Sequence, residues 1–292
     1  MKPLALNLDH CGTIVRDLDL AQQAFQDLGF KLTLRSHHVG SPSPGAPIEP
    51  LGSANHCAML QQGYLEVLGH VDPAKTSNAV AMLKRYEGVH IVAFRPESSE
   101  AIQTALIDQG QPVDPVRNLE RMTPFGLHGK EMRRVAFRNM RFNTEVFTEA
   151  QFQYTEHLTR SVMWQTHLLE HPNGALALDC VYMCSPDPEA TAKKLSPLLG
   201  VEPQSPSTGE FVLAFARSSL RILSPEVWQA QAPGAPLPPL PAPVGFAVLT
   251  NSLLQAQEVF QGNVIPFQRT PAGGLRVRTC GTVIEFFEKG AR

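Results

Sequence analysis

One structural unit is repeated four times along this chain of 292 residues. Each unit begins with a short β-prone run and continues through a polar turn into an amphipathic helical segment that closes with a glycine. These glycines are Gly29, Gly110, Gly200 and Gly262, at places where a left-handed cap favours a residue without Cβ. After each glycine the hydrophobic period changes to that of extended chain, with short runs separated by turn residues. Each unit is therefore predicted to be a βαβββ module.

The modules cover approximately residues 4–72, 86–160, 174–228 and 243–292. One module is too small to cover both faces of its own sheet, so we expect the first to pair with the second and the third with the fourth. The predicted fold class is α+β, with curved mixed β-sheets in two domains, residues 1–172 and 173–292. Residues 36–54 are rich in Pro, Gly and Ser and predict a long loop that could cover a site, and residues 232–243 predict an extended proline-rich connector.

Composition excludes several classes of protein. Apolar residues make up 43% of the chain and charged residues 18%, values typical of a packed globular protein and unlike those of a disordered one. A net charge of -2 provides no positive field for nucleic acid. We expect neither a membrane span nor a signal peptide, because the apolar runs are too short. The five cysteines include no C-x-x-C pair, which favours free thiols and a cytoplasmic location.

Two strands in each of the first two modules carry one ionisable side chain on a face that is otherwise apolar. In the first module these are His10, which alternates with Leu8, and Glu66 in the run YLEVLG. In the second module, VHIVAF carries His90 and FQYTE carries Glu156. Because side chains alternate between the two faces of a strand, each of these four groups is expected to point toward apolar neighbours.

The spacing of these four residues follows the repeat. His10 and His90 lie 80 residues apart, Glu66 and Glu156 lie 90 apart, and the two helix-ending glycines lie 81 apart. A buried carboxylate costs several kcal/mol unless it is paired, protonated or bound to a metal. Two imidazoles and two carboxylates in one cavity would suit a divalent ion such as Zn, Ni, Co, Mn or Fe(II). The four residues are therefore predicted to be metal ligands.

Structural interpretations of the same residues stay open. A single histidine on a strand is commonly a hydrogen-bonded core residue, and Glu66 could pair with an arginine. His56 and His38 are candidate substrate contacts, although His56 could equally be structural and His38 lies in the proline-rich loop. Arg138, within the run RRVAFRNMR, could hold an acidic substrate at the mouth of the site or belong to a solvated strand face.

The distribution of histidine divides the chain in two. All ten histidines lie at or before His171, so the last 121 residues contain none. Glu285 is the one proposed ligand position that keeps its residue type in the second half. We therefore expect the second half to keep the fold without the ligands, and to serve packing, dimerisation or the walls of the cavity.

These features resemble the vicinal oxygen chelate superfamily, and within it the glyoxalase-like domain proteins. The segments LDHCGTIVRDLDLAQQAFQDLGF and ANHCAMLQQGYLEVLGHVDP look like the opening strand and helix and the third and fourth strands of that family. The likeness is good over residues 4–180 and faint beyond them. It implies a divalent metal held by the first and last strands of two paired modules, at His10, Glu66, His90 and Glu156.

Three functions remain as hypotheses. The first is a glyoxalase-like metalloenzyme of the lyase or isomerase type, in which the metal polarises a small carbonyl or vicinal-oxygen substrate and Glu156, or Glu66 by symmetry, acts as general base. The second is an Fe(II) dioxygenase of the extradiol type that uses His10, His90 and Glu156. The third is a non-catalytic protein whose cavity captures a small apolar molecule. In each case the partner is a small molecule, and the protein is expected to be a monomer or a homodimer.

Overall fold

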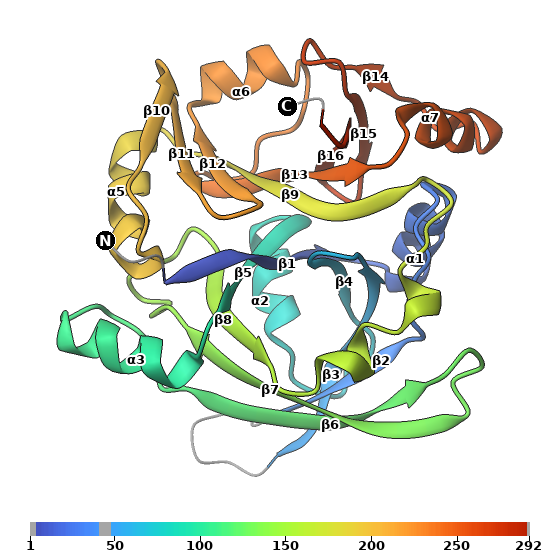
Figure 1. The fold of residues 1–292 in the computed structure, drawn as a ribbon, viewed down its shortest axis with the longest axis vertical. Coiled ribbons are helices and arrows are strands. Elements are labelled where there is room, and N and C mark those ends of the chain that lie inside the picture. The colour runs from blue at the N-terminus through green and yellow to red at the C-terminus, as the bar shows by residue number, and fades with distance from the viewer. Residues whose placement is uncertain (1–3, 41–47, 291–292) are drawn as a thin grey trace.

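The computed structural model describes residues 4–40 and 48–290 and contains two eight-stranded mixed β-sheets (Figure 1). The first sheet consists of β1 (Ala5–Val15), β2 (Ser36–Gly40), β3 (Glu49–Met59), β4 (Tyr64–His70), β5 (Gly88–Pro96), β6 (Arg117–Phe125), β7 (Glu131–Arg141) and β8 (Gln151–His157). The second consists of β9 (Ala175–Cys184), β10 (Gln204–Ser207), β11 (Glu210–Ala214), β12 (Ser219–Leu223), β13 (Ala242–Thr250), β14 (Gln268–Arg269), β15 (Leu275–Thr279) and β16 (Thr282–Glu288).

The helices follow the predicted modules. They are α1 (Leu18–Asp27), α2 (Asn78–Arg85), α3 (Ser99–Asp108), α4 (Arg160–Met163), the 3-10 turn η1 (Thr166–Leu168), α5 (Pro188–Leu199), α6 (Pro225–Gln231) and α7 (Leu253–Gly262). A side chain caps the first turn of each long helix, as Asp17 does for α1 by accepting from the backbone of Asp19 and Leu20. The domain boundary expected at residues 172 and 173 falls between η1 and β9.

Strand order confirms the predicted pairing of modules. The first sheet runs β2-β3-β4-β1-β5-β8-β7-β6, and the second repeats this order with β10-β11-β12-β9-β13-β16-β15-β14. In each sheet the first strands of two modules pair antiparallel at the centre, β1 with β5 and β9 with β13, and each also pairs parallel with the last strand of its own module. The α+β fold of four βαβββ modules is therefore confirmed.

Two local expectations need correction. Residues 36–54 are not one long loop, because Ser36–Gly40 form β2 and pair antiparallel with β3. Residues 30–35, the first extended run expected after Gly29, do not form a strand. Of the segment that was expected to cover the site, residues 41–47 lie outside the described residues. Gly29, Gly110 and Gly200 have positive φ as predicted, but Gly262 is the last residue of α7 and Val264 takes the left-handed conformation with φ 56°.

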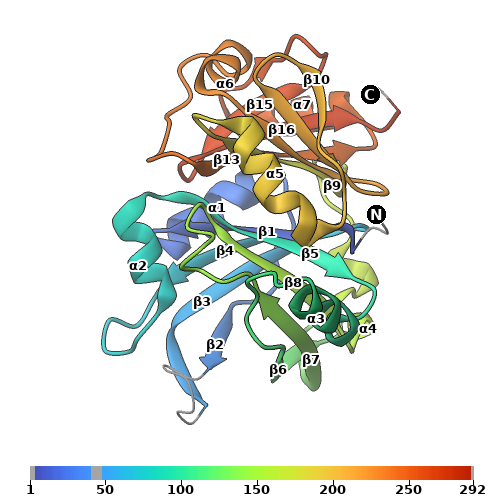
Figure 2. The ribbon, with the colours of Figure 1, turned by 90° about the vertical axis from the view of Figure 1, so that its left-hand side faces the viewer.

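The two sheets pack against each other through their central strands. In Figures 1 and 2 the β9 and β13 pair of the second half lies over β1 and β5 of the first. One apolar cluster runs through both halves and includes Phe94 and Phe152 from the first and Val181 and Phe246 from the second. The inner faces of the two sheets lie away from this contact and take no part in it.

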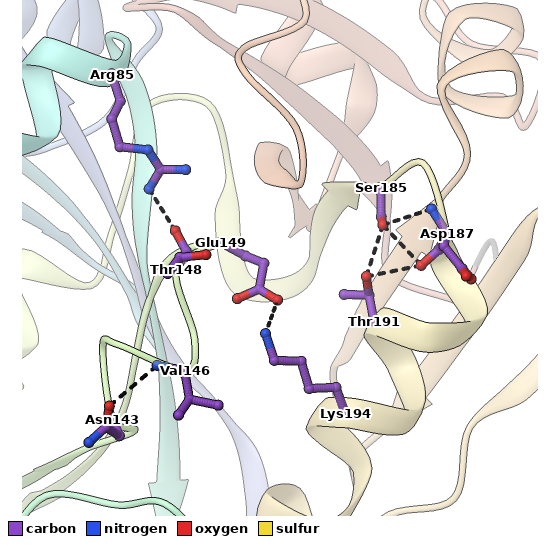
Figure 3. A network of polar contacts seen from close by, with 9 residues as sticks. All are labelled: Arg85, Asn143, Val146, Thr148, Glu149, Ser185, Asp187, Thr191 and Lys194. Carbon is purple, nitrogen blue, oxygen red and sulfur yellow. Dashed lines mark hydrogen bonds and ion pairs between the residues drawn. The ribbon is translucent and has the colours of Figure 1, made fainter.

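Polar contacts tie the halves together at one edge (Figure 3). Lys194 on α5 bonds to the carboxylate of Glu149, two residues before β8. Within the first half, Arg85 donates to the carbonyl of the adjacent Thr148 (2.9 Å). Tyr154 also donates from its hydroxyl to the carbonyl of Leu198 (2.8 Å). Among the described residues, none of the helices has the length and apolar run that a membrane crossing requires.

Candidate functional site

The first sheet curves around a cavity of about 640 Å³, a volume typical of small-molecule sites. Its floor is formed by β1, β4, β5 and β8, and its walls by β2 and β3 on one side and β6 and β7 on the other. Met82 of α2 and Met163 of α4 also line it, from the segments that follow the first and second modules. Predicted residues His10, Glu66 and His38 line this cavity.

His90 and Glu156 lie outside the cavity. His90 Nε2 donates to the carbonyl of Tyr86 (3.0 Å), and the two rings stack with centroids 3.8 Å apart. Burial lowers the pKa of His90 to about 4, so this imidazole is neutral near pH 7. Glu156 accepts from the backbone N–H of Ser99 (2.8 Å), in the first turn of α3. Both groups are therefore satisfied by structural partners on the other face of the sheet.

The two remaining predicted contacts also lie outside. Arg138 pairs with Glu100 (3.5 Å) and Glu156 (3.6 Å) beside α3. His56 bonds through Nδ1 to the carbonyl of Thr33 (2.9 Å), and burial lowers its pKa. Both side chains occupy positions one residue away from those that face the cavity, so they serve the packing of the outer face.

Shifts of one residue at His90 and of three residues at Glu156 explain why the four expected ligands do not meet. At the centre of the sheet Cys11 pairs with Val92, which makes residues 81 apart equivalent, and the counterpart of His10 is therefore Ile91. Glu66 pairs with Gly12, and by the same rule its counterpart is Gln153, which pairs with Ala93. A change of position by an odd number of residues moves a strand side chain to the other face. The glycine spacing of 81 already indicated Ile91 as the counterpart of His10, whereas Glu66 and Gln153 lie 87 residues apart.

The residues present do not fit the expected four-ligand metal centre. Ile91 carries no donor atom, which leaves His10 and Glu66 with the neutral amide of Gln153. Within residues 4–40 and 48–290, no three His, Cys, Asp or Glu side chains gather in a way that could hold a metal ion. The same geometry removes the Fe(II) triad of His10, His90 and Glu156, since only His10 faces the cavity.

His10 is held by a buried carboxylate that sequence alternation did not reveal. Between Leu8 and His10 the pairing with β5 shifts by one residue, and this β-bulge brings Asp9 beside His10. Asp9 accepts hydrogen bonds from His10 Nδ1 (2.7 Å) and His157 Nε2 (3.0 Å). Burial raises the pKa of Asp9, but the two imidazoles outweigh it and hold that pKa well below its usual range. The ring of His10 also stacks on Tyr64, with centroids 4.4 Å apart.

Glu66 is oriented by a neighbouring amide. Asn55 Nδ2 donates to Glu66 Oε1, and His38 Nε2 lies 3.9 Å from the same oxygen. Burial lowers the pKa of His38, Glu66 opposes that change and Arg121 adds to it. Gly12 makes room for the Glu66 carboxylate, because a Cβ at this position would lie 3.2 Å from Oε2 and 2.9 Å from the Cβ of Ile91.

The opposite wall contributes three arginines: Arg141 belongs to the run RRVAFRNMR that was considered for an acidic substrate, whereas Arg117 and Arg121 were not expected at the site. Arg117 and Arg121 on β6 and Arg141 on β7 line the cavity, together with Asn139. Asn139 is the counterpart of Asn55, since Cys57 pairs with Glu66 and Arg141 with Gln153. The two equivalent asparagines lie 84 residues apart, a spacing that could have been noticed.

The second half has filled the corresponding space. Trp228 of α6 packs among Tyr182, Ala247 and Val283 on the inner face of the second sheet. Glu285, equivalent in position to Gln153, is buried and bonded to Arg276, and it accepts from the hydroxyl of Tyr182 (2.7 Å). The carboxylate that survives in the second half is therefore neutralised within the fold.

The sequence matches the family model described as glyoxalase-like domain over residues 8–199, more than half of the chain. Together with its fold, this match shows that the chain belongs to the glyoxalase-like domain family, and the resemblance to the vicinal oxygen chelate superfamily is confirmed. Among curated proteins, none matches the sequence significantly.

Three solved structures share the fold. A hypothetical protein from Staphylococcus aureus is 12% identical with a TM-score of 0.64, and the match covers 97% of this chain and 99% of that one. The Mn(II)-bound glyoxalase from Novosphingobium aromaticivorans is 13% identical with a TM-score of 0.57, covering 98% and 83%. A mutant 4-hydroxymandelate synthase from Streptomyces coelicolor is 13% identical with a TM-score of 0.59, covering 99% and 94%.

Proposed function

We propose that the first half of the chain binds a small carbonyl compound and moves a proton at the carbon next to the carbonyl, with His10 as general base. The observation that carries the proposal is the 2.7 Å hydrogen bond from His10 Nδ1 to Asp9. A buried carboxylate in this position fixes the tautomer of an imidazole and stabilises the imidazolium that forms. It leaves Nε2 directed to the cavity, where a proton can be accepted.

The proposed step uses the residues of the cavity alone. Nε2 of His10 takes the proton from carbon, and the electron pair of that bond moves onto the carbonyl oxygen. Glu66, held by Asn55, lies on the neighbouring strand and is the second group able to carry a proton. The guanidinium groups on the opposite wall supply the positive charge that a developing oxyanion requires. No step passes through a metal ion, because the donor set is incomplete.

Hydrogen exchange tests this proposal without knowledge of the natural substrate. The protein is mixed with 2-oxohexanoate or hexanal in deuterated water, and loss of the proton next to the carbonyl is followed by NMR. We expect His10→Gln to slow exchange by about 10² to 10⁴-fold. Glu156→Gln, which changes the carboxylate on the other face, should leave the rate unaltered. Failure of the wild type to accelerate exchange of either compound would contradict the proposal, as would an unaffected His10→Gln variant.

Asp9 is a positioning residue in this scheme, because it contacts His10 and not the substrate. Asp9→Asn should lower kcat while KM changes little, since the cavity wall keeps its shape. A metal assay completes the test: exchange that disappears on chelation, with one equivalent of bound metal by elemental analysis, would make His10 a ligand and overturn its role as base. Binding of the probes without exchange would favour a non-catalytic binding protein.

A further inference from the structure

We infer that the molecule bound in this cavity is a hydroxylated acid, whose oxyanion contacts Arg117, Arg121 and Arg141 and whose hydroxyl group donates to Asn55. The inference names the substrate class of the site and, for the reaction itself, rests on the proposed function. Its support comes from the contrast between arginines on the two faces of one wall, from an unpaired buried acceptor, and from the separation of charge across the cavity.

Arginines on the two faces of β6 and β7 have different partners. On the outer face of β7, Arg134 pairs with Glu120 (2.6 Å) and Arg138 pairs with two glutamates. The arginines that line the cavity are Arg117, Arg121 and Arg141. Within the described ranges, none of these three has a carboxylate within ion-pair distance. The outer arginines are therefore neutralised by the fold. Of the inner ones, Arg121 donates to the neutral hydroxyl of Ser36, so the positive charge of the three remains available to an anion from solution.

The two arginines at the end of this wall repel each other. Arg117 pairs in the strand ladder with Asn139, two residues from Arg141. Burial lowers the pKa of Arg141, the charge of Arg117 lowers it further and Asp114 opposes both. Guanidinium groups this close are stabilised by an oxyanion that both can contact, and the planar fork of arginine matches the oxygens of a carboxylate or phosphate.

The wall formed by β2 and β3, opposite the arginines, requires a hydrogen-bond donor from the ligand. Asn55 is only 4% exposed, and its Nδ2 donates to Glu66, which fixes the orientation of the amide. Its Oδ1 is buried and has no hydrogen-bond partner among the described residues, and the same holds for Oδ1 of the equivalent Asn139. Buried acceptors in native proteins are nearly always satisfied. A hydroxyl group of the ligand would satisfy Asn55.

Glu66 and the amide of Asn55 line one side of the cavity, and Arg117 and Arg141 line the other. Arg121 extends from β6 to bond Ser36 of β2, and Glu120, which also lines the wall formed by β6, is paired with Arg134. Between them lie apolar side chains: Tyr64, Leu68, Ile91, Phe137 and Met163. A molecule that satisfies all three regions has an acid group at one end, a hydroxyl group at the other side and an apolar carbon body.

Binding of unreactive probes tests the inference by calorimetry. The probes are 6-hydroxyhexanoate, hexanoate and 6-hydroxyhexanamide, with hexyl phosphate in a separate arm that identifies the oxyanion. We expect 6-hydroxyhexanoate to bind at least about tenfold more tightly than hexanoate, because hexanoate leaves a buried acceptor unpaired. The neutral amide should bind more weakly by a similar factor. Tighter binding of the phosphate than of hexanoate would assign the oxyanion as phosphate.

Variants locate the binding energy. Arg117→Ala combined with Arg141→Ala should weaken the binding of 6-hydroxyhexanoate at least about tenfold, and Asn55→Leu should erase the preference for the hydroxylated probe. Arg138→Ala, on the outer face of the same strand, is the matched control and should bind as the wild type does. Circular dichroism verifies that each variant is folded.

Three results would overturn the inference: equal affinity for acid and amide, wild-type affinity in the double arginine variant, or no binding of any probe. These outcomes do not depend on His10 as a base, because the probes do not react. If His10→Gln keeps the binding pattern while hydrogen exchange is absent from the wild type, the proposed reaction fails and the ligand class stands.

Discussion

At the scale of single residues, the partners of Asp9 and of His90 explain the opposite behaviour of these two buried groups. Asp9 remains charged because two imidazoles surround it. His90 remains neutral because burial has only the carbonyl of Tyr86 to offset it. The two histidines that looked equivalent in the sequence therefore have different roles: His10 is hydrogen-bonded to the carboxylate of Asp9 at the cavity, and His90 is a neutral packing residue.

His90 should make stability depend on pH. In the unfolded chain its pKa is near 6.5, and in the folded protein it is lowered to about 4. Between these values the unfolded state binds more protons, so the free energy of unfolding falls as pH drops from about 6.5 to 4, by up to about 3 kcal/mol for this residue.

Urea unfolding across this pH range measures the effect. The difference in unfolding free energy between wild type and His90→Gln should shrink as the pH decreases, since the variant has lost the group that resists protonation. His37→Gln, which changes an exposed histidine, is the control and should give a curve parallel to that of the wild type. A His90→Gln curve that is also parallel would contradict the assignment.

At the scale of elements, the helices, the repeat and the strand order could be predicted, because they depend on the period of hydrophobic residues and on helix-capping residues. Ser98 and Ser252 cap α3 and α7 as their sequence positions suggest. Which residues of each strand face the cavity could not be predicted to within one position. A β-bulge at Asp9 and a slip between repeats leave hydrophobic composition unchanged, while they exchange which side chains face the cavity. His10 and Glu66 therefore line the cavity as expected, whereas His90 and Glu156 lie outside it, and the ligand role of all four stays a prediction.

Restoring the expected donors at the positions that face the cavity tests this register. Ile91→His combined with Gln153→Glu should create a site for Zn or Mn with His10 and Glu66, because positions 91 and 153 are the structural counterparts of 10 and 66. Calorimetry should detect about one equivalent of tightly bound metal in the double variant. The same pair of changes combined with His90→Ala and Glu156→Gln should bind equally well. A folded double variant that binds no more metal than the wild type would show that the register is not as described.

At the scale of the whole molecule, the same topology encloses a cavity in the first half and a filled core in the second. The helix between the paired modules accounts for this difference, because α2 and α6 occupy corresponding places in the two halves. Ala79 and Met82 of α2 line the cavity of the first half, whereas Trp228 of α6 fills the corresponding space in the second half. The residues after α6 complete the filling, with Ala232 and Ala235 buried in the same cluster. The ligand site is thus confined to the first half by side-chain size as much as by the absence of histidine.

Trp228→Ala tests whether the filled second half affects the cavity in the first half. The indole is 1% exposed and packs against Tyr182, with ring centroids 5.6 Å apart. Its removal should cost about 3 to 5 kcal/mol of unfolding free energy, because a large cavity is left inside the second half. Probe binding and hydrogen exchange in the first half should remain at wild-type levels under conditions where the variant is folded. A variant that stays folded but loses probe binding would show that the second half determines the shape of the cavity in the first half.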